Sequence, residues 1–489
     1  MQETESRPSI RRGALGQFFT PVPVAGLLAS MFDPPTGEVR VLDPGAGVGS
    51  LTAALVSRAV TETWPVTLDL HAVEVDEDLI PALKETLLGC EDVSTPVTTA
   101  LHTADFIEWA TRQLTIGPTT AEAGLFDLAI LNPPYRKLNT ASPECGLLSD
   151  VGIAATNLYA AFVALTLRLL VPGGQLVAIT PRSFCNGPYF KAFRREILAT
   201  GSLRRIHVYE SRSKAFQDAE VLQENVVLHM VKDAEQGDVI ITSSSGGDDE
   251  AIRERVVAFA TVVSPNDPNS FIHIVADERE SAVAGNVRSL AAELGCIGAS
   301  VSTGKVVDFR AREHLHMEPQ VGTVPLLYPV HLRDGRVKWP ASNGKKANAI
   351  AVNAETRRMF LPTGNYVLVK RFSSKEERRR VVASVLESGD LGTDELAVEN
   401  HVNVFHHQGS GLPLQLAWGI ATYLNSTTVD VFFRQFNGHT QVNATDLRSI
   451  RYPSVEQLRT LGHAARDGAR DQMTIDMLVD RFVPELNGS

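Results

Sequence analysis

Long apolar runs, paired cysteines and clustered metal ligands are all missing from this sequence of 489 residues. No apolar run approaches the roughly 20 residues that a membrane-spanning helix needs, and the start, MQETESRPSIRRG, has no signal-peptide core. These absences predict a cytoplasmic protein without a membrane partner. The composition, 44% hydrophobic and 21% charged, is that of an ordinary globular protein, and the length suffices for two or three domains.

Cysteine is scarce as well. The four cysteines lie far apart and form no C-x-x-C pair, so we expect free thiols and no zinc site. The pairs His314/His316 and His406/His407 are interpreted as lacking companion ligands, which favours surface or core histidines over a metal site. The cysteines are Cys90, Cys145, Cys185 and Cys296.

Positive charge is in short supply overall, with a net charge of −11, but it is unevenly distributed. Residues 331–380 contain thirteen Lys or Arg and four acids, a local balance of +9. Such a window is typical of a surface that binds nucleic acid, although a solvated helix face explains its SSKEERRRVV segment equally well. Five of its members are predicted to contact nucleic acid, chiefly at phosphates: Lys345, Lys346, Lys370, Arg371 and Arg378.

Strand-like and helix-like patterns alternate through the first half of the chain. VRVLDPG, LDLHAVEVD, TTALHTADF, FDLAILNPP and QLVAIT are typical of strands, and apolar helical segments separate most of them. This β-α-β-α rhythm predicts an α/β fold with a doubly wound, mostly parallel sheet. RRIHVYE and ENVVLHMVK are expected as late strands, the second as an antiparallel edge strand.

The rhythm stops at a polar run, TSSSGGDDE, at residues 242–250, which is the best linker candidate in the chain. We therefore expect a catalytic domain over residues 1–242 and a second, mixed α+β domain over residues 243–489. Short strands and turns are expected in the second domain, followed by a helical segment from about Val455.

A glycine-rich turn follows the first strand. In VLDPGAGVGSL, Asp43 precedes three glycines at alternate positions, Gly45, Gly47 and Gly49, before a helix begins. The spacing differs from the G-x-G-x-x-G of dinucleotide-binding folds, and glycines let a backbone approach a ligand without a Cβ in the way. The acid suits a cationic ligand such as S-adenosylmethionine, which carries an ammonium and a sulfonium. A plain tight β-α turn is the alternative.

Acids also end the next two strands. Glu74 ends the second, where a carboxylate can accept hydrogen bonds from ribose hydroxyls. Asp105 ends the third and can accept from an adenine amino group, while Phe106 offers an apolar face. One acid at a strand end is unremarkable, but acids at successive strand ends favour a cofactor that contains a nucleoside.

The fourth strand ends at Asn132-Pro133-Pro134-Tyr135. Proline cannot donate to a β-ladder, and Pro133 keeps Asn132 out of helical geometry, so the tetrapeptide is expected as a stiff loop at the carboxyl rim of the sheet. The Asn132 side-chain oxygen and the Pro133 carbonyl can each accept one hydrogen of an exocyclic amino group. Tyr135 can stack on a base. A bland strand-ending turn is the alternative.

Together these motifs resemble those of the γ-class amino-group DNA methyltransferases over about residues 13–232. GQFFTP is similar to the motif that closes over the cofactor's methionine end, which implies a contact from Thr20. SKAFQDAEVLQENVVLHMV is similar to the segment whose aromatic residue, here Phe216, packs on the flipped base. The resemblance implies a class I S-adenosylmethionine-dependent methyltransferase fold. It implies cofactor contacts from Thr20, Asp43, Gly45, Gly47, Gly49, Glu74, Asp105, Phe106, Asn132 and Pro134, and catalytic roles for Asn132, Pro133, Pro134, Tyr135 and Phe216.

The second half carries a weaker resemblance. SVSTGKVVDF, YVLVKRFSSKEERRR and YLNSTTVDVFFRQFNGHTQVNATDLRSI are similar to the target-recognition half of type II adenine methyltransferases of restriction-modification systems. The resemblance implies methyl transfer from S-adenosylmethionine to N6 of a flipped adenine in double-stranded DNA. It implies no metal, and a cognate restriction endonuclease that acts separately is a candidate partner.

Other activities remain open or are excluded. RNA adenine methylation and methylation of a protein glutamine amide, which presents a similar planar NH2, stay open, as does a DNA-binding protein with a decayed methyltransferase fold. Cytosine-C5 methylation is excluded, because neither PECG nor SFCNG places a cysteine nucleophile beside a methyltransferase loop. Zinc deamination is excluded because the H-x-E…P-C-x-x-C signature is missing.

Overall fold

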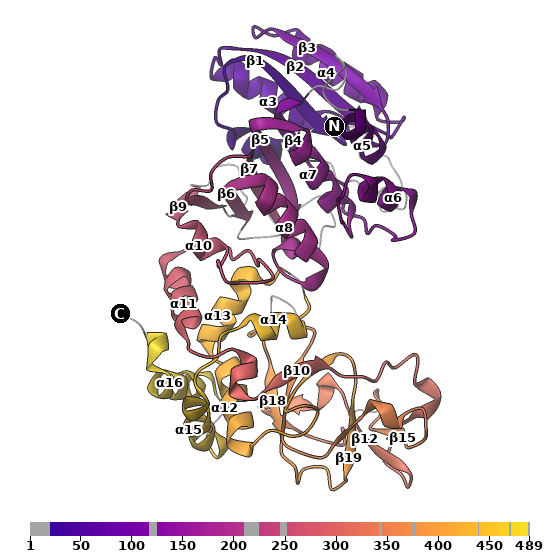
Figure 1. Ribbon diagram of the computed structural model, residues 1–489, viewed down its shortest axis with the longest axis vertical. Coiled ribbons are helices and arrows are strands. Elements are labelled where there is room, and N and C mark those ends of the chain that lie inside the picture. The colour runs from indigo at the N-terminus through magenta and orange to yellow at the C-terminus, as the bar shows by residue number, and fades with distance from the viewer. Residues whose placement is uncertain are drawn as a thin grey trace. The chain divides into compact units, whose positions relative to one another are not determined.

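The computed structural model (Figure 1) describes residues 20–116, 125–209, 224–244, 252–341, 345–373, 377–438, 440–468 and 471–487. The chain divides into two compact units, residues 1–276 and 277–489. Phe216 lies outside the described residues. In the described parts of the chain, every helix is too short or too polar to span a membrane.

A single nine-stranded sheet forms the frame of the first unit. Its strands are β1 Gly37–Pro44, β2 Val66–Glu74, β3 Val97–Thr103, β4 Phe126–Leu131, β5 Leu170–Pro181, β6 Gly201–Tyr209, β7 Asn225–Lys232, β8 Val239–Ser244 and β9 Arg253–Val257. Their order is β3-β2-β1-β4-β5-β7-β6-β8-β9, and β1 to β5 are parallel. The expected doubly wound, mostly parallel sheet is therefore confirmed. β7 is antiparallel to β5 and β6, as expected, but the expectation of an edge strand was wrong, because β6, β8 and β9 extend the sheet beyond it.

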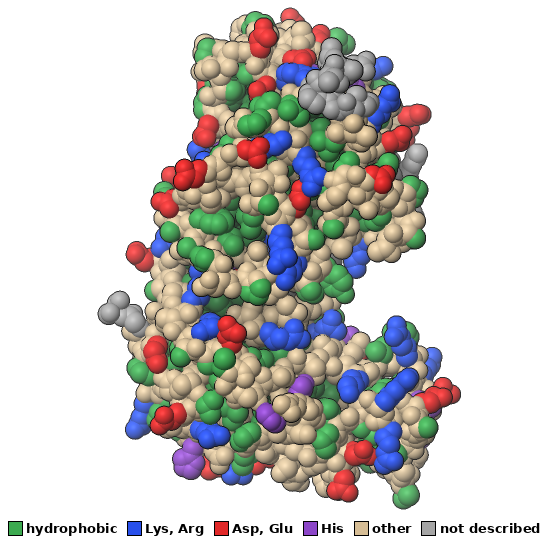
Figure 2. Space-filling model, in the orientation of Figure 1, with side chains coloured by type: hydrophobic (Ala, Val, Ile, Leu, Met, Phe, Trp, Pro, Cys, Tyr) green, Lys and Arg blue, Asp and Glu red, His purple; other side chains and the backbone are tan. Residues whose placement is uncertain are grey.

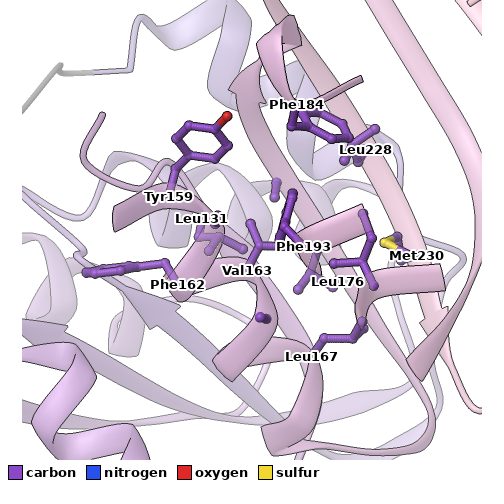
Figure 3. Close-up of a cluster of buried hydrophobic side chains, with 14 of the residues drawn as sticks. Leu131, Tyr159, Phe162, Val163, Leu167, Leu176, Phe184, Phe193, Leu228 and Met230 are labelled. Atoms are coloured by element: carbon purple, nitrogen blue, oxygen red, sulfur yellow. The ribbon is translucent and has the colours of Figure 1, made fainter. Parts of the chain in front are cut away.

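Apolar side chains alternate between the two faces of the central strands. In β4, Leu128 and Ile130 pack into one buried layer, whereas Ala129 and Leu131 pack into the other. A strand buried on both faces is a continuous apolar run in sequence, which is why FDLAIL was readily recognised. Helices α2, α3 and α4 contribute to the first layer and α5, α7 and α8 to the second, whose α7 side is shown in Figure 3. The helices of this unit are α2 Val22–Ser30, α3 Ser50–Thr61, α4 Ile80–Glu91, α5 Phe106–Ile116, α6 Pro143–Asp150, α7 Leu158–Leu169, α8 Lys191–Thr200 and α10 Phe259–Val262.

The division between the units falls after Ala276, later than the boundary expected at residue 242. Residue 242 lies inside β8, which pairs in parallel with β6 and antiparallel with β9. The sheet of the first unit therefore continues past the expected boundary. Residues 242–244 of the expected linker are strand, and residues 245–250 lie outside the described residues.

The second unit is mixed α+β, as expected. One sheet has the order β10-β20-β17-β18-β14-β13 and the other β11-β15-β12-β19-β16. The helical segment expected from Val455 is confirmed as α15 and α16, whereas α11, α12 and α13 were not foreseen. The strands are β10 Ser300–Thr303, β11 Leu315–His316, β12 Thr323–Leu327, β13 Leu332–Arg333, β14 Arg336–Val337, β15 Ala349–Ala351, β16 Phe360–Pro362, β17 Tyr366–Lys370, β18 Ala383–Leu386, β19 Glu395–Val398 and β20 Val402–His406, and the helices are α11 Glu278–Ser289, α12 Leu414–Leu424, α13 Thr427–Phe436, α14 Ala444–Ser449, α15 Val455–Arg466 and α16 Gln472–Phe482.

Two glycines bring α12 and α15 into direct contact. A Cβ added at Gly419 would overlap the backbone oxygen of Leu458, and a Cβ added at Gly462 would overlap that of Gln415. Only glycine allows the backbones to approach so closely. This contact ties the C-terminal helices to the sheet of β17 and β18, against which α12 packs.

Candidate active site

The carboxyl ends of β1, β2, β3 and β4 form one rim of the sheet, because these strands are parallel neighbours. Asp43, Glu74 and Asn132 lie at or just beyond these ends. The chain order reverses between β1 and β4, and ligands of open α/β sheets bind at such a switch point. An open hollow lined by Trp64 and Pro96 lies at the opposite, amino end of β1 and β2, away from this chemistry.

The glycine turn after β1 needs left-handed backbone at each glycine. The φ angles are +74° at Gly45, +59° at Gly47 and +83° at Gly49. At Gly49 a Cβ would lie 2.9 Å from Cγ2 of Thr86, so glycine is required there by packing as well. At Gly47 nothing lies within 4 Å of an added Cβ, which leaves open space above the turn.

Glu74 joins the end of β2 to the glycine turn. Its side chain is buried, and Oε2 accepts a hydrogen bond of 2.8 Å from the Gly47 N–H. Oε1 accepts from the N–H groups of Val75 and Asp76 at 2.9 and 2.8 Å. Three backbone donors therefore hold this carboxylate at the rim, with its charge compensated.

Asp43 is equally buried but much less satisfied. Oδ2 accepts a 2.7 Å hydrogen bond from the Thr52 hydroxyl, whereas Oδ1 is buried without a partner among the described residues. Burial raises the pKa of Asp43 to about 7; the Thr52 hydrogen bond opposes that rise, and the nearby Glu74 carboxylate adds to it. A buried carboxylate oxygen without a donor is costly, so the site is suited to a cationic or hydrogen-bonding ligand. Thr52 was not predicted, because a threonine within a helix gives no sequence signal.

Phe106 begins α5, and Asp105 precedes it, two residues beyond the end of β3 rather than at the strand end where it was expected. Asp105 is exposed, and its Oδ1 accepts from the N–H groups of Ile107 and Glu108 at 2.9 and 3.1 Å, so it caps the helix. Phe106 is buried, with its ring centroid 4.7 Å from that of Phe162. The structure thus gives both residues a part in building the rim, and their predicted contacts with an adenine remain predictions.

The Asn132 amide is held from two sides. Its Nδ2 donates to Oγ1 of Thr20 at 3.0 Å, and its Oδ1 accepts from the Tyr135 hydroxyl at 3.1 Å. Thr20 lies 112 residues upstream, so the fold brings two separately predicted site residues into contact. Pro133 is buried and Pro134 half-buried. The tetrapeptide therefore presents an oriented amide at the rim, beside the end of β1.

Tyr135 acts as a neutral donor. Burial raises the pKa of its phenol well above the usual range, so the hydroxyl stays protonated and cannot serve as a general base. The centroids of the Tyr135 and Tyr159 rings lie 6.2 Å apart in an edge-to-face arrangement, and the Tyr159 hydroxyl lies 3.3 Å from the Ser183 hydroxyl. Tyr159 and Ser183 were not predicted, because Tyr159 belongs to an almost uniformly apolar helix that gives no sign of a polar contact.

In the second unit, the fold disperses the basic window at residues 331–380. Arg336 pairs with Glu387 at 3.1 Å and lies over the ring of Trp418 at 4.7 Å. Arg380 is fully buried and donates to Oδ1 of Asn437. Internal pairs of this kind remove part of the +9 balance from the surface, so the window is not one continuous basic face.

The five residues predicted to contact nucleic acid divide in the same way. Lys345 and Arg378 are exposed and Lys370 is half-buried at the end of β17. Lys346 pairs with Asp308 at 2.7 Å. Arg371 is half-buried, and its Nη1 donates to the backbone oxygen of Asn400 at 3.2 Å.

His314 has two carboxylate neighbours, one adjacent in sequence and one from a distant segment. Its Nε2 lies 3.3 Å from Glu355 and 3.9 Å from Glu313. The interpretation that this histidine lacks companion ligands was therefore wrong, since Glu355 comes from a distant segment. Asn353 Oδ1 accepts from the N–H groups of Glu355 and Thr356, so its Nδ2 donates to His314 Nδ1 at 3.3 Å. That contact leaves the proton on Nε2, facing Glu355, and we assign no metal to the cluster.

Comparison with known proteins identifies the family. Residues 73–216 match the family model described as Eco57I restriction-modification methylase. The chain is 44% identical over 454 residues to the type II methyltransferase M.BsuBI of Bacillus subtilis, covering 92% of this chain and 90% of that protein. It is 42% identical over 475 residues to M.PstI of Providencia stuartii, covering 96% and 93%.

The similarity extends to solved structures. The type IIL restriction-modification enzyme MmeI, solved in complex with DNA, has a similar fold, with a TM-score of 0.56 and 10% identity over 92% of this chain and 69% of that one. The two relatives above span both units at more than 40% identity. The chain therefore belongs to the type II methyltransferases.

Proposed function

We propose that the protein transfers a methyl group from S-adenosylmethionine to N6 of a flipped adenine in double-stranded DNA, as the modification enzyme of a restriction-modification system. The observation that carries this proposal is the Asn132 amide, held between Thr20 and Tyr135 at the rim where β1 and β4 meet. A separately acting cognate endonuclease is the partner that such a system requires. The family match and the two bacterial relatives support this assignment.

The residues at the end of β1 fit the proposed cofactor. Oδ1 of Asp43, which has no partner among the described residues, offers an acceptor to the cationic end, and the open turn at Gly47 allows close backbone approach. Glu74 and Asp105 would receive the ribose and adenine groups. When bound, S-adenosylmethionine supplies the methyl carbon as an electrophile on its sulfonium. The chain's own contribution on this side is binding and orientation.

On the target side, Asn132 and Pro133 carry the chemistry. The lone pair of N6 is delocalised into the adenine ring and is poorly nucleophilic. The Asn132 side-chain oxygen and the Pro133 carbonyl would each accept one N6 hydrogen, which draws the nitrogen toward tetrahedral geometry and exposes its lone pair. Tyr135, whose hydroxyl bonds to Asn132, fixes the amide and would stack on the flipped base together with Phe216. The second unit would recognise the surrounding sequence.

DNA from cells that express the chain tests the proposal. Nucleoside mass spectrometry should detect N6-methyladenine with the wild type and none above background with Asn132→Ala, which removes the amide; equal thermal unfolding of the two proteins is the control for an intact fold. Digestion with methylation-sensitive nucleases would then give the sequence context. A methyl group on RNA adenine, on a protein glutamine or on cytosine, with unmodified DNA adenine, would overturn the proposal and identify the substrate.

A further inference from the structure

An exposed phenylalanine stands at the tip of a well-anchored turn in the second unit. The side chain of Phe309 is 77% exposed. The Val307 carbonyl accepts hydrogen bonds of 3.0 Å from the N–H groups of both Arg310 and Ala311, which closes the turn beneath it. Val306 and Ala311, on either side, are buried in the same apolar cluster. The ring therefore projects from a fixed backbone.

Asp308 anchors the turn a second time. One oxygen accepts from the Tyr328 hydroxyl at 2.7 Å, and the other accepts from the Lys346 ammonium at 2.7 Å. These contacts leave Phe309 with no part in holding the turn together. An apolar ring in water costs free energy, and single exposed apolar residues are common, so the surroundings of the ring must decide its role.

One cation lies beside the ring, and others come from the same turn or from segments in contact with it. The Arg310 guanidinium lies 5.4 Å from the Phe309 ring centroid, and the Lys305 ammonium lies 3.5 Å from the backbone oxygen of Arg358. Five exposed cations of this region have no acidic partner among the described residues. Figure 2 shows Lys and Arg side chains gathered on the visible face of the second unit. We call the following residues the Phe309 surface: Lys305, Phe309, Arg310, Arg312, Lys345 and Arg358.

We propose that the Phe309 surface binds the DNA duplex, with Phe309 set against bases in a groove and the cations on the flanking phosphates. Cations alone would suit any polyanion. A rigid apolar ring that projects from among them suits a duplex, where two rows of phosphates border a groove that exposes base edges and thymine methyls. Aromatic and aliphatic side chains also wedge between base steps in such grooves. This inference rests on the proposed function and assigns part of the target-binding surface.

The two kinds of contact have different signatures. Phe309→Ala should weaken binding of a cognate duplex by roughly 5- to 150-fold without changing the salt dependence, since no ionic contact is lost. Arg310→Ala and Arg312→Ala should each reduce the log–log salt slope by about 0.9, on cognate and scrambled duplexes alike. Fluorescence anisotropy with labelled duplexes at several salt concentrations measures both quantities.

Met473→Ala is the matched control. Met473 is 73% exposed on α16, so its removal deletes a comparable apolar side chain outside the Phe309 surface, and wild-type binding is expected. Equal thermal unfolding of all variants would show that the folds are intact. Wild-type affinity for Phe309→Ala, or an equal loss for Met473→Ala, would overturn this inference while leaving the proposed function standing. A wild-type protein that neither binds nor methylates duplex DNA would overturn both.

Discussion

At the carboxyl rim of the first unit's sheet two acids, Asp43 and Glu74, are buried and held by hydrogen bonds, whereas the cations of residues 331–380 are divided between internal pairs and open surface. Glu74 receives three backbone N–H groups, and Asp43 receives one hydroxyl. In the basic window, Arg336 is bound to Glu387, while Lys345 is exposed. A count of charges along a sequence therefore predicts a binding surface only where the fold leaves those charges unpaired.

The two rim acids differ from each other as well. Both are nearly inaccessible, at 4% exposure for Glu74 and 2% for Asp43. Glu74 is compensated before any ligand arrives, while Asp43 keeps one oxygen without a donor in the part of the chain that the structure describes. Glu74 helps to form the rim, whereas Asp43 can still accept a hydrogen bond from a ligand. Substitutions of these two residues should therefore have different effects.

The largest effect is expected from Glu74→Ala. The change removes the acceptor of three backbone donors as well as the predicted ribose contact, so affinity for S-adenosylmethionine should fall at least about 100-fold, equivalent to roughly 3 kcal/mol. Calorimetric titration measures this. The affinity of Glu74→Gln, which keeps one acceptor oxygen, should lie between that of the wild type and that of Glu74→Ala. Wild-type affinity in Glu74→Ala would mean that this acid only shapes the turn.

Asp43→Asn should act through pH. Because the folded pKa is raised from 3.8 to about 7, burial of the charged form lowers the stability of the free protein progressively as pH rises between those values, and Asp43→Asn should remove this loss. A cationic ligand binds the deprotonated form, so wild-type cofactor affinity should rise about tenfold from pH 6 to pH 8. Titrations across this range should give a flatter profile for Asp43→Asn; parallel profiles would exclude Asp43 as the titrating group.

The smallest effects are expected within the basic window. Arg336→Ala should lower the free energy of unfolding by about 1–2 kcal/mol, because a half-buried ion pair and a cation–π contact are lost, and leave the salt slope of DNA binding unchanged. Lys345→Ala should leave stability within about 0.5 kcal/mol and reduce that slope by about 0.9. Chemical denaturation and salt titration of both variants measure this, and the reverse pattern would show that exposure does not identify the DNA contacts.

The local sequence pattern was enough to predict the first unit's sheet and most of the residues at its carboxyl rim. The strands are short apolar runs, and their polar ends are adjacent in sequence to the strands that carry them, so Asp43, Glu74 and Asn132 could be placed together. Contacts between distant segments could not be predicted. The Thr20 contact with Asn132 is made across the fold, and nothing in the residues around Lys346 shows that Asp308 will neutralise it.

The same limit applies to the larger architecture. The sheet continues through β8 and β9 because β6 is still available for pairing, and the polar run that follows β8 gave no sign of it. Helices α11 to α13 could not be predicted from the sequence, because their apolar residues are buried against neighbours that come from elsewhere in the chain. The contact between Gly419 of α12 and Leu458 of α15 is an example. Such partners are set by topology rather than by local periodicity.

The strand order also has a consequence for how the enzyme is assembled. β1 pairs with β2, the next strand in the chain, along eight residues, but it meets β4 only at Val41 and Leu42, after a detour of almost ninety residues. Closing short loops costs less conformational entropy than closing long ones, so β1, β2 and β3 should associate first. During synthesis on the ribosome, we expect β1, β2 and β3, which carry the predicted cofactor contacts Asp43 and Glu74, to associate before β4, which Asn132 follows, joins the sheet.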